Sequence, residues 1–422
     1  MDNNSFFVTT PIYYVNDVPH IGHAYTSIAC DVLARFNRLN NKNTFFLTGT
    51  DEHGLKMEQA AKKKNMDTKK FVDEMSMNFK KLAKILNLTN DFFIRTTDEF
   101  HKKASQHIWN ILEKNDQIYL DKYKGWYSIN DEAYFNDKEI STDKKTKKKV
   151  APSGHEVQWV EEESYFFKLS KWQGKLLDYY QKNPDFIGPE SRKNEVISFV
   201  KNGLKDLSIS RTTFSWGIQV PNNAKHIMYV WLDALINYLS AIGYPDKKYK
   251  KFWPANVHII GKDIIRFHAV YWPAFLLAAD IELPKRIFAH GWWTNEGKKI
   301  SKSLGNVIDP NEIIKTYGID TLRFFLLREV PFGNDGDFSK KSLQRRMNND
   351  LANDLGNLVQ RVLTIINKNL DGKLSKIKQI KENDKKIYEY PEELLKNIEK
   401  NYEKQEFHKV IENIWKLISK AN

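Results

Sequence analysis

Alternation of strand-like and helix-like runs dominates residues 1–116 of the chain. SFFVTT (5–10) and TFFLTG (44–49) are apolar, aromatic and β-branched, as strands are. Between them, AYTSIACDVLARFNRL (24–39) has apolar residues at helical spacing. DFFIRTT (91–97) and the segment after His101 form another strand–helix pair. Repetition of this kind predicts an α/β fold with a doubly wound parallel sheet.

A block of different texture, from Gln117 to Lys225, interrupts this alternation. It contains YKGWYSINDEAYF (123–135), which is typical of short antiparallel strands joined by turns. The polar, lysine-rich stretch STDKKTKKKVAPSG (141–154) predicts a mobile hairpin or loop. Because the alternation of strand-like and helix-like runs returns in residues 226–293, we interpret the block as an insertion between two halves of one sheet.

Helical periodicity takes over from Ser339. One stripe carries apolar residues at spacings of three and four: Met347, Leu351, Leu355, Leu358, Val362 and Ile365. PEELLKNIEK and FHKVIENIWKLIS repeat the pattern, so residues 341–422 are expected to form a helical bundle. The sequence ends in a helix-like stretch without a stop signal, which leaves a small bundle or a truncated one.

Composition narrows the class of protein. A formal net charge of +13 favours a polyanionic partner, although a solvated surface rich in lysine explains it equally well. The single cysteine, Cys30, excludes an internal disulfide and a site with several thiolate zinc ligands. Since no apolar run reaches the roughly 18 residues of a membrane span and no targeting segment is evident, we expect a cytoplasmic protein without a membrane partner.

Two histidines and a glycine stand where the first strand gives way to a helix, in Pro19-His20-Ile21-Gly22-His23. A helix N-terminus presents unpaired N–H groups to anions, and the imidazoles can donate to phosphate oxygens. The missing side chain of Gly22 lets a flat base approach closely. Taken alone, these residues are equally well explained as two surface histidines and a turn.

Two further segments could contribute charge. Lys298-Lys299-Ile300-Ser301-Lys302-Ser303 is suited to a flexible loop over a triphosphate, although an ordinary basic turn is the simpler explanation for this run alone. Asp51 follows the second strand in TGTDEHG (48–54), where parallel sheets bind ligands and where a carboxylate could hold an ammonium group. Helix capping by Thr50 or Asp51 would explain these residues as well.

Together these motifs resemble those of class I aminoacyl-tRNA synthetases, in which a PHIGH-like signature is followed far downstream by one similar to KKISKSLGN. Five longer segments resemble methionyl-tRNA synthetases of a zinc-free, bacterial- or organellar-like type, in the same order along nearly the whole chain: PIYYVNDVPHIGHAYTS, FLTGTDEHG, YVWLDALINYL, IGKDIIRFHAVYWPAFL and LANDLGNLVQR. The resemblance implies a Rossmann-type catalytic sheet (1–116 and 226–293) and a connective insertion (117–225). A KISKS loop with a stem-contact region (294–340) and an α-helical anticodon-binding domain (341–422) would follow.

The resemblance also implies a reaction: methionine and ATP would give methionyl-adenylate and pyrophosphate, and the methionyl group would pass to tRNA(Met), including the initiator. His20 and His23 would stabilise the α-phosphate, with Gly22 against the adenine. Lys302, helped by Lys299, would hold the outer phosphates. Gly261 and Asp263 would bind the nucleoside, with Asp263 on the ribose. Mg²⁺ bound through phosphates and water is expected, zinc is not, and we expect a monomer.

The resemblance further implies a methionine pocket. Asp51 would bind the ammonium group with help from the backbone of Ile12. The residues expected around the thioether are Tyr14, Trp231, Ala234, Leu235, Tyr238, Ile264 and His268. Aromatic walls suit the polarizable sulfur of methionine, and Tyr238 and His268 could supply a polar contact to it. Without the resemblance, core packing would be the better explanation for the aromatic residues.

At the carboxyl-terminal side, Asn357 and Arg361 share one helix face and match family positions that bind anticodon bases. Ser128 and Asp131 stand where zinc-binding relatives carry a cysteine pair, which is why no zinc is predicted. Synthetases for leucine, isoleucine and valine usually carry a larger editing insertion, and a cysteine-specific enzyme would need zinc. Two competing hypotheses are an RNA-binding protein of synthetase shape without aminoacylation activity, and a nucleotidyltransferase.

Overall fold

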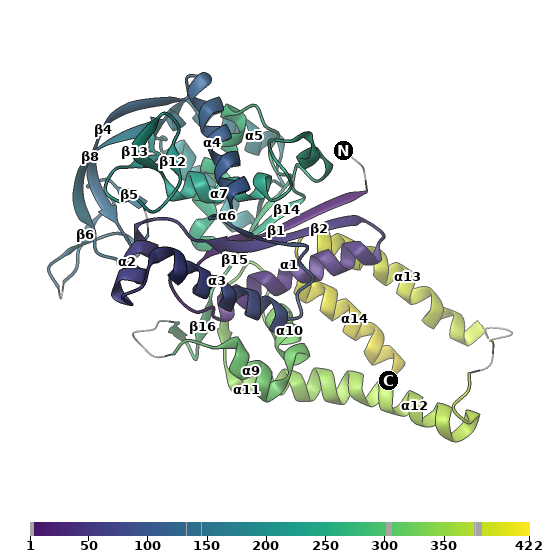
Figure 1. Ribbon diagram of the computed structural model, residues 1–422. Helices are drawn as coiled ribbons and strands as arrows, with labels where there is room; N and C mark the ends of the chain where they lie inside the picture. Colours follow the sequence, from purple (N-terminus) through teal and green to yellow (C-terminus); the bar gives the residue numbers. More distant parts are fainter. Residues whose placement is uncertain (1–3, 132, 145, 301–305, 375, 377–381) are drawn as a thin grey trace. The chain divides into compact units, whose positions relative to one another are not determined.

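The computed structural model describes residues 4–131, 133–144, 146–300, 306–374, 376 and 382–422 (Figure 1). Met1–Pro19 and Cys30–Ala289 form one compact unit, unit 1, and His20–Ala29 and His290–Asn422 form a second, unit 2. Among the helices within those described ranges, none is long and apolar enough to cross a membrane.

A six-stranded sheet forms the centre of unit 1. Its strands are β1 (Ser5–Tyr14), β2 (Asn43–Asp51), β3 (Phe92–Arg95), β9 (Ile187–Gly188), β14 (Val257–Gly261) and β15 (Ile287–His290), in the order β3-β2-β1-β14-β15-β9. The pairs β1–β2, β2–β3, β1–β14 and β15–β9 are all parallel. The predicted parallel sheet, with strands from both sides of the insertion, is confirmed.

Helices fill the connections between these strands and pack in two separate clusters. Helix α1 (Ile21–Leu39) links β1 to β2, and α2 (Leu55–Lys63) and α3 (Thr68–Ile85) link β2 to β3. In one apolar cluster, Phe7 of β1 packs with residues of α4 (Glu99–Lys114), α7 (Val230–Ser240) and α8 (Trp272–Ala278). The other joins Tyr13 to α2 and α3. Figure 1 shows α3 on the opposite side of the sheet from α4 and α7, as a doubly wound fold requires.

The insertion is largely antiparallel. Its main sheet has the order β10-β8-β4-β5, built from β4 (Ile118–Ser128), β5 (Ala133–Phe135), β8 (Gln158–Phe167) and β10 (Leu207–Ser208). The lysine-rich stretch forms a small hairpin of β6 (Ser141–Thr142) and β7 (Lys149–Val150). A three-stranded sheet follows, made of β11 (Ser210–Arg211), β12 (Gln219–Val220) and β13 (Asn223–Met228). Between β8 and β10, helices α5 (Gln173–Lys182) and α6 (Glu190–Lys201) flank β9, which returns to the edge of the central sheet.

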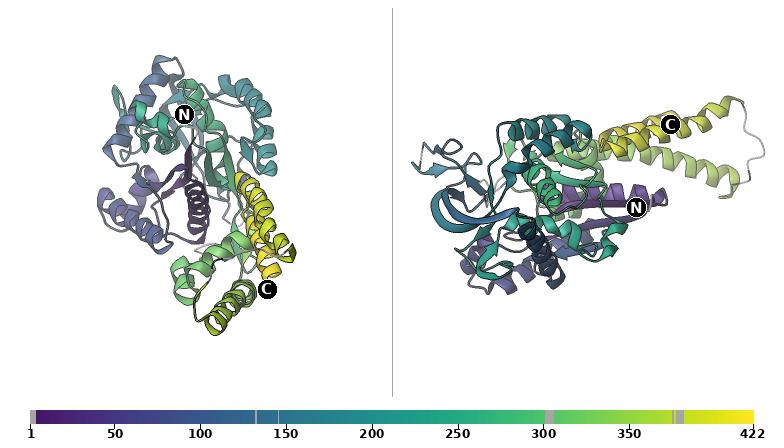
Figure 2. Two further views of the ribbon diagram at one scale, coloured as in Figure 1. Left: turned by 90° about the vertical axis from the view of Figure 1, so that its right-hand side faces the viewer. Right: turned by 90° about the horizontal axis from the view of Figure 1, so that it is seen from above.

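Unit 2 is mostly helical. A short sheet of β16 (Trp293–Asn295), β17 (Lys298–Lys299) and β18 (Gly336–Phe338) accompanies α9 (Pro310–Tyr317), α10 (Ile319–Arg328) and α11 (Lys340–Arg346). Then come α12 (Asn357–Leu370), α13 (Glu382–Glu403) and α14 (Phe407–Ala421), and α13 packs along α14 (Figure 2). The segment Met347–Gly356 is π-helical, so its wider turns shift the predicted apolar stripe. Val362 and Ile365 of the predicted stripe are exposed, as are Val359 and Leu363, and α12 has no buried residue, which the helical spacing did not predict.

Candidate active site

The carboxyl ends of three adjacent strands gather several of the predicted site residues in unit 1. The strands β2, β1 and β14 are neighbours, and they end at Asp51, Tyr14 and Gly261. Tyr14 is the register partner of Asp51, and Ile12 is that of Gly49. Because parallel strands all end at one edge, the carboxylate of Asp51 lies beside the Tyr14 strand at the edge where such sheets bind ligands. Asp51 is 2% exposed.

Helix α7 supplies one wall of this site. Trp231, Ala234, Leu235 and Tyr238 recur at helical spacing and are all buried. The Trp231 ring meets the Tyr14 ring edge-on, with centroids 6.3 Å apart. Trp231 also stacks on Phe267, with centroids 3.7 Å apart and planes inclined by 5°. Phe267 was missed in the sequence, although its position next to His268 could have drawn attention to it.

The most informative pair in this wall is Tyr238 and His268. His268 Nδ1 lies 3.0 Å from the carbonyl oxygen of Ile264, so it donates its proton to that oxygen. The neutral ring then accepts at Nε2 the hydroxyl proton of Tyr238, across 2.7 Å. Burial lowers the pKa of His268 to about 4, so the ring stays neutral at neutral pH. The pair therefore offers fixed polar atoms in a largely apolar wall.

The histidines of the PHIGH motif belong to unit 2, at the start of α1. His20 Nδ1 accepts the N–H of Gly22 at 3.1 Å, and His23 Nδ1 accepts the N–H of His20 at 3.0 Å. With both Nδ1 atoms accepting, each neutral ring carries its proton on Nε2 and can donate from it. Burial, and the neighbouring His20, lower the pKa of His23 well below its usual value. A Cβ on Gly22 would lie 3.0 Å from the His20 ring.

Comparison with known proteins places this arrangement in a family. Residues 6–363 match the family model described as tRNA synthetases class I (M). The methionine–tRNA ligase of Rickettsia bellii is 57% identical over an alignment 427 residues long, which covers 100% of this chain and 82% of the relative. That of Brucella suis is 52% identical over 424 residues, with 100% and 82% covered. The chain belongs to the methionyl-tRNA synthetase family.

Solved structures agree with the family assignment. Mycobacterium tuberculosis methionyl-tRNA synthetase in complex with methionyl-adenylate aligns with a TM-score of 0.96 at 48% identity, over 99% of this chain and 82% of that chain. The apo form of the same enzyme aligns with a TM-score of 0.86 at 45% identity, over 99% and 80%. The expected family and fold are thereby confirmed.

Not every residue expected at the nucleotide can be placed. Asp263 is exposed in a short 3-10 turn, Lys262–Ile264, directly after β14 and Gly261. Lys299 lies in β17. Lys302 falls outside the described residues, so its predicted role in holding phosphates stays a prediction.

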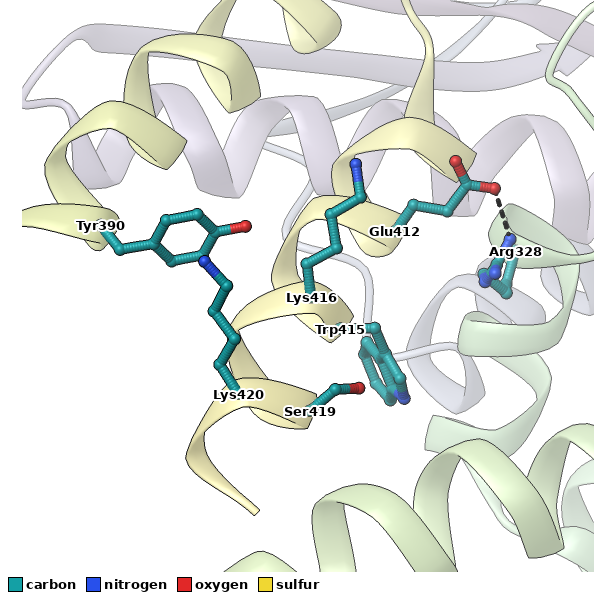
Figure 3. A pocket seen from close by; sticks show the side chains of 7 residues that line it. All are labelled: Arg328, Tyr390, Glu412, Trp415, Lys416, Ser419 and Lys420. Carbon is teal, nitrogen blue, oxygen red and sulfur yellow. Dashed lines mark hydrogen bonds and ion pairs between the residues drawn. The ribbon is translucent and has the colours of Figure 1, made fainter. Parts of the chain in front are cut away.

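The predicted anticodon residues both lie on α12, four residues apart, and Arg361 contacts Asn422 through its Nη1 atom at 3.4 Å. A separate open pocket of about 490 Å³ lies beside α14, with basic, aromatic and acidic side chains (Figure 3): Arg328, Tyr390, Glu412, Trp415, Lys416, Ser419 and Lys420. Its walls include the Arg328–Glu412 ion pair at 3.0 Å and the Lys420 ammonium above the Tyr390 ring. Neither Asn357 nor Arg361 lines this pocket.

The insertion holds a hydrogen-bonded polar cluster around Asp131, which includes Ser128. Ser128 and Ser153 donate to Asp131 Oδ2 at 2.7 and 2.6 Å, and His155 Nδ1 lies 2.7 Å from Asp131 Oδ1. Burial alone would raise the pKa of Asp131, but these partners lower it below its usual value. Within the part of the chain that the structure describes, no group of three or more His, Cys, Asp or Glu residues could hold a metal ion. The absence of zinc remains a prediction.

The lowered pKa of His268 predicts a pH-dependent loss of stability. Between pH 6.5 and about 4 the unfolded chain binds a proton that the folded ring does not, so the free energy of unfolding falls as the pH falls. From pH 7 to pH 5, wild-type protein should lose about 2 kcal/mol more than His268→Gln. Urea denaturation of both proteins at each pH measures this difference. Equal losses in the two proteins would contradict the assignment.

Proposed function

We propose that the chain is a methionine–tRNA ligase. A carboxylate oxygen of methionine would attack the α-phosphorus of ATP, and the bond to the departing pyrophosphate would break. A hydroxyl of the terminal adenosine of tRNA(Met), initiator tRNA included, would then attack the adenylate carbonyl and release AMP. No covalent bond to the protein is needed, since positioning and electrostatic stabilisation suffice.

The observation that carries the proposal is a buried carboxylate, that of Asp51, together with a buried polar pair on an aromatic wall. Asp51 would hold the ammonium group, while the side chain of methionine would extend along Tyr14 and Trp231 towards Tyr238 and His268. The Tyr238 hydroxyl lies 2.7 Å from His268 Nε2, and both residues are buried. A thioether gains from aromatic and polar contacts of this kind, whereas an aliphatic side chain gains less.

In the first step, we propose that His20 and His23 donate from Nε2 to the α-phosphate as negative charge develops there. Both rings are set up for this by the backbone N–H bonds at their Nδ1 atoms. Mg²⁺ would be bound mainly by phosphate and water oxygens. Lys299 and Lys302 would hold the outer phosphates, and Gly261 and Asp263 the nucleoside.

For the second step, we propose that Asn357 and Arg361 on α12 bind anticodon bases and that the protein acts as a monomer in the cytoplasm. The net charge of +13 supports binding to a polyanion. Because loop bases are unstacked, an arginine plane and an amide on one helix face can contact them directly.

Amino-acid-dependent ATP–pyrophosphate exchange with each of the twenty amino acids tests the proposal. We expect exchange with methionine alone, followed by charging of tRNA(Met) in a second assay. Exchange with another amino acid would change the specificity assigned here. A folded protein that binds ATP but exchanges with none would favour an RNA-binding protein without aminoacylation activity, which gel-shift titration with tRNA(Met) would then examine.

A further inference from the structure

A charged residue lies inside α7, a buried and otherwise largely apolar helix of unit 1. All eleven residues of α7 are buried, and the helix carries the proposed methionine-binding side chains. Asp233, Asn237 and Ser240 recur at spacings of four and three, so they form a separate polar face. A buried carboxylate is costly unless strong hydrogen bonds compensate it.

Two histidines from distant parts of the chain provide this compensation. Asp233 Oδ2 lies 2.6 Å from His53 Nδ1, and Asp233 Oδ1 lies 2.7 Å from His101 Nε2. Both rings are as buried as the carboxylate. Burial would raise the pKa of Asp233, but the two histidines hold it at about 2. The Asp233 side chain is therefore an ionised acceptor with a donor at each oxygen.

The other side of each histidine is fixed as well. His101, in the first turn of α4, also has its Nδ1 atom 2.8 Å from the hydroxyl oxygen of Ser240. The His53 ring meets Trp216 edge-on, with centroids 5.8 Å apart. One carboxylate thus connects α7, α4 and the loop after β2.

That loop directly follows Asp51, the last residue of β2. His53 is two residues beyond Asp51, and the intervening residue, Glu52, is tied to β3 through Arg95 at 2.7 and 2.8 Å. Glu52 accepts a further bond from Thr97 at 2.6 Å. The loop is thereby held to β3 at Glu52 and to α7 at His53. Of the contacts described here, the His53–Asp233 bond is the one that connects this loop to α7.

We propose that Asp233, acting through His53 and His101, is a positioning residue that sets the separation between Asp51 and the substrate-facing side of α7. This inference rests on the proposed function, because it assigns the ammonium group of methionine to Asp51 and its thioether to α7. The separation would match the length of a methionine side chain. Asp233 itself would touch no substrate. It would act by holding Asp51 and the substrate-facing side of α7 at a fixed separation.

Asp233→Asn tests the inference while preserving the size of the side chain. An amide has no negative charge and only one acceptor oxygen, so one of the two histidines no longer faces an acceptor oxygen. We expect the KM for methionine in pyrophosphate exchange to rise about ten- to a hundredfold, with the KM for ATP changed less than about twofold. We also expect weaker preference for methionine over ethionine, which is longer by one methylene, because the separation is no longer fixed.

Paired variants of the histidines give the conservative rescue. Asn places its amide near the position of His Nδ1, so His53→Asn should retain most methionine affinity that His53→Ala loses. His101→Gln, which can place a donor near Nε2, should be compared with His101→Ala in the same way. If Asp233→Asn does not fold, these two pairs decide the question by the same KM comparison.

Asp31→Asn is the matched control. Asp31 is an equally buried carboxylate of unit 1, bonded to Arg35 Nε at 2.8 Å and to the backbone N–H of Thr89 at 2.6 Å. The Asp31→Asn protein should have a lower free energy of unfolding in urea denaturation, without a change in the KM for methionine. Wild-type protein that exchanges with methionine, together with an Asp233→Asn variant that behaves like Asp31→Asn, would overturn the inference. Wild-type protein that does not exchange at all would instead overturn the proposed function.

Discussion

Replacing His23 with alanine is expected to slow methionine-dependent pyrophosphate exchange about 10²- to 10³-fold, with little change in the KM for methionine. The reason is the bond pattern at the start of α1. His23 Nδ1 accepts the backbone N–H of His20 at 3.0 Å, which directs the proton of the neutral ring to Nε2. A donor aimed at charge that develops on the α-phosphate stabilises the transition state more than the ground state.

Two further variants separate this explanation from a loss of folding. His23→Gln keeps an N–H donor at the end of the side chain and should recover part of the lost rate. His107→Ala removes a histidine of α4 that the proposed mechanism does not use, and it should exchange within about twofold of wild type. A loss of rate in His23→Ala that arises only from a higher KM for methionine would contradict the assignment to the phosphate end.

Much of the architecture was accessible from the sequence because its signals are local. The β1 and β2 strands and the intervening helix have clear periodicity, and a parallel sheet places the ends of both strands at one edge. The predicted junction before α1 is confirmed, since the helix begins at Ile21. The two-residue strand β9 could not be found in this way, because so short a run has no periodicity.

The residues that sequence analysis missed depend on contacts between distant segments. His53 and Asp233 are 180 positions apart, and no spacing rule relates them. A signal was nevertheless present: Asp233 is the single charged residue in YVWLDALINYL, and a charge in so apolar a run calls for a buried partner. The π-helical Met347–Gly356 was also inaccessible, since its apolar residues fit ordinary helical spacing. Resemblance to a family supplied the roles of the pocket residues, which packing alone would have explained.

Asp51→Asn should raise the KM for methionine by about two to three orders of magnitude. Asp51 is 2% exposed at the end of β2, in register with Tyr14. An ammonium group bound there would be largely removed from water, and removing one partner of a buried ion pair costs about 3–5 kcal/mol. At about 1.4 kcal/mol per tenfold change, the expected loss follows. Pyrophosphate exchange over a range of methionine concentrations measures it, with the KM for ATP as the internal reference.

A methionine analogue without its amino group, 4-(methylthio)butanoate, provides the decisive comparison. It lacks the charge that Asp51 is proposed to bind, so as a competitive inhibitor it should bind wild type and Asp51→Asn within about twofold of each other. Equal weakening of methionine and the analogue would mean that Asp51 shapes the site without contacting the ammonium group. Unchanged affinity for methionine would place the ammonium group elsewhere. Weaker binding of methionine, with unchanged binding of the analogue, is the outcome that would show contact between Asp51 and the amino group of the substrate.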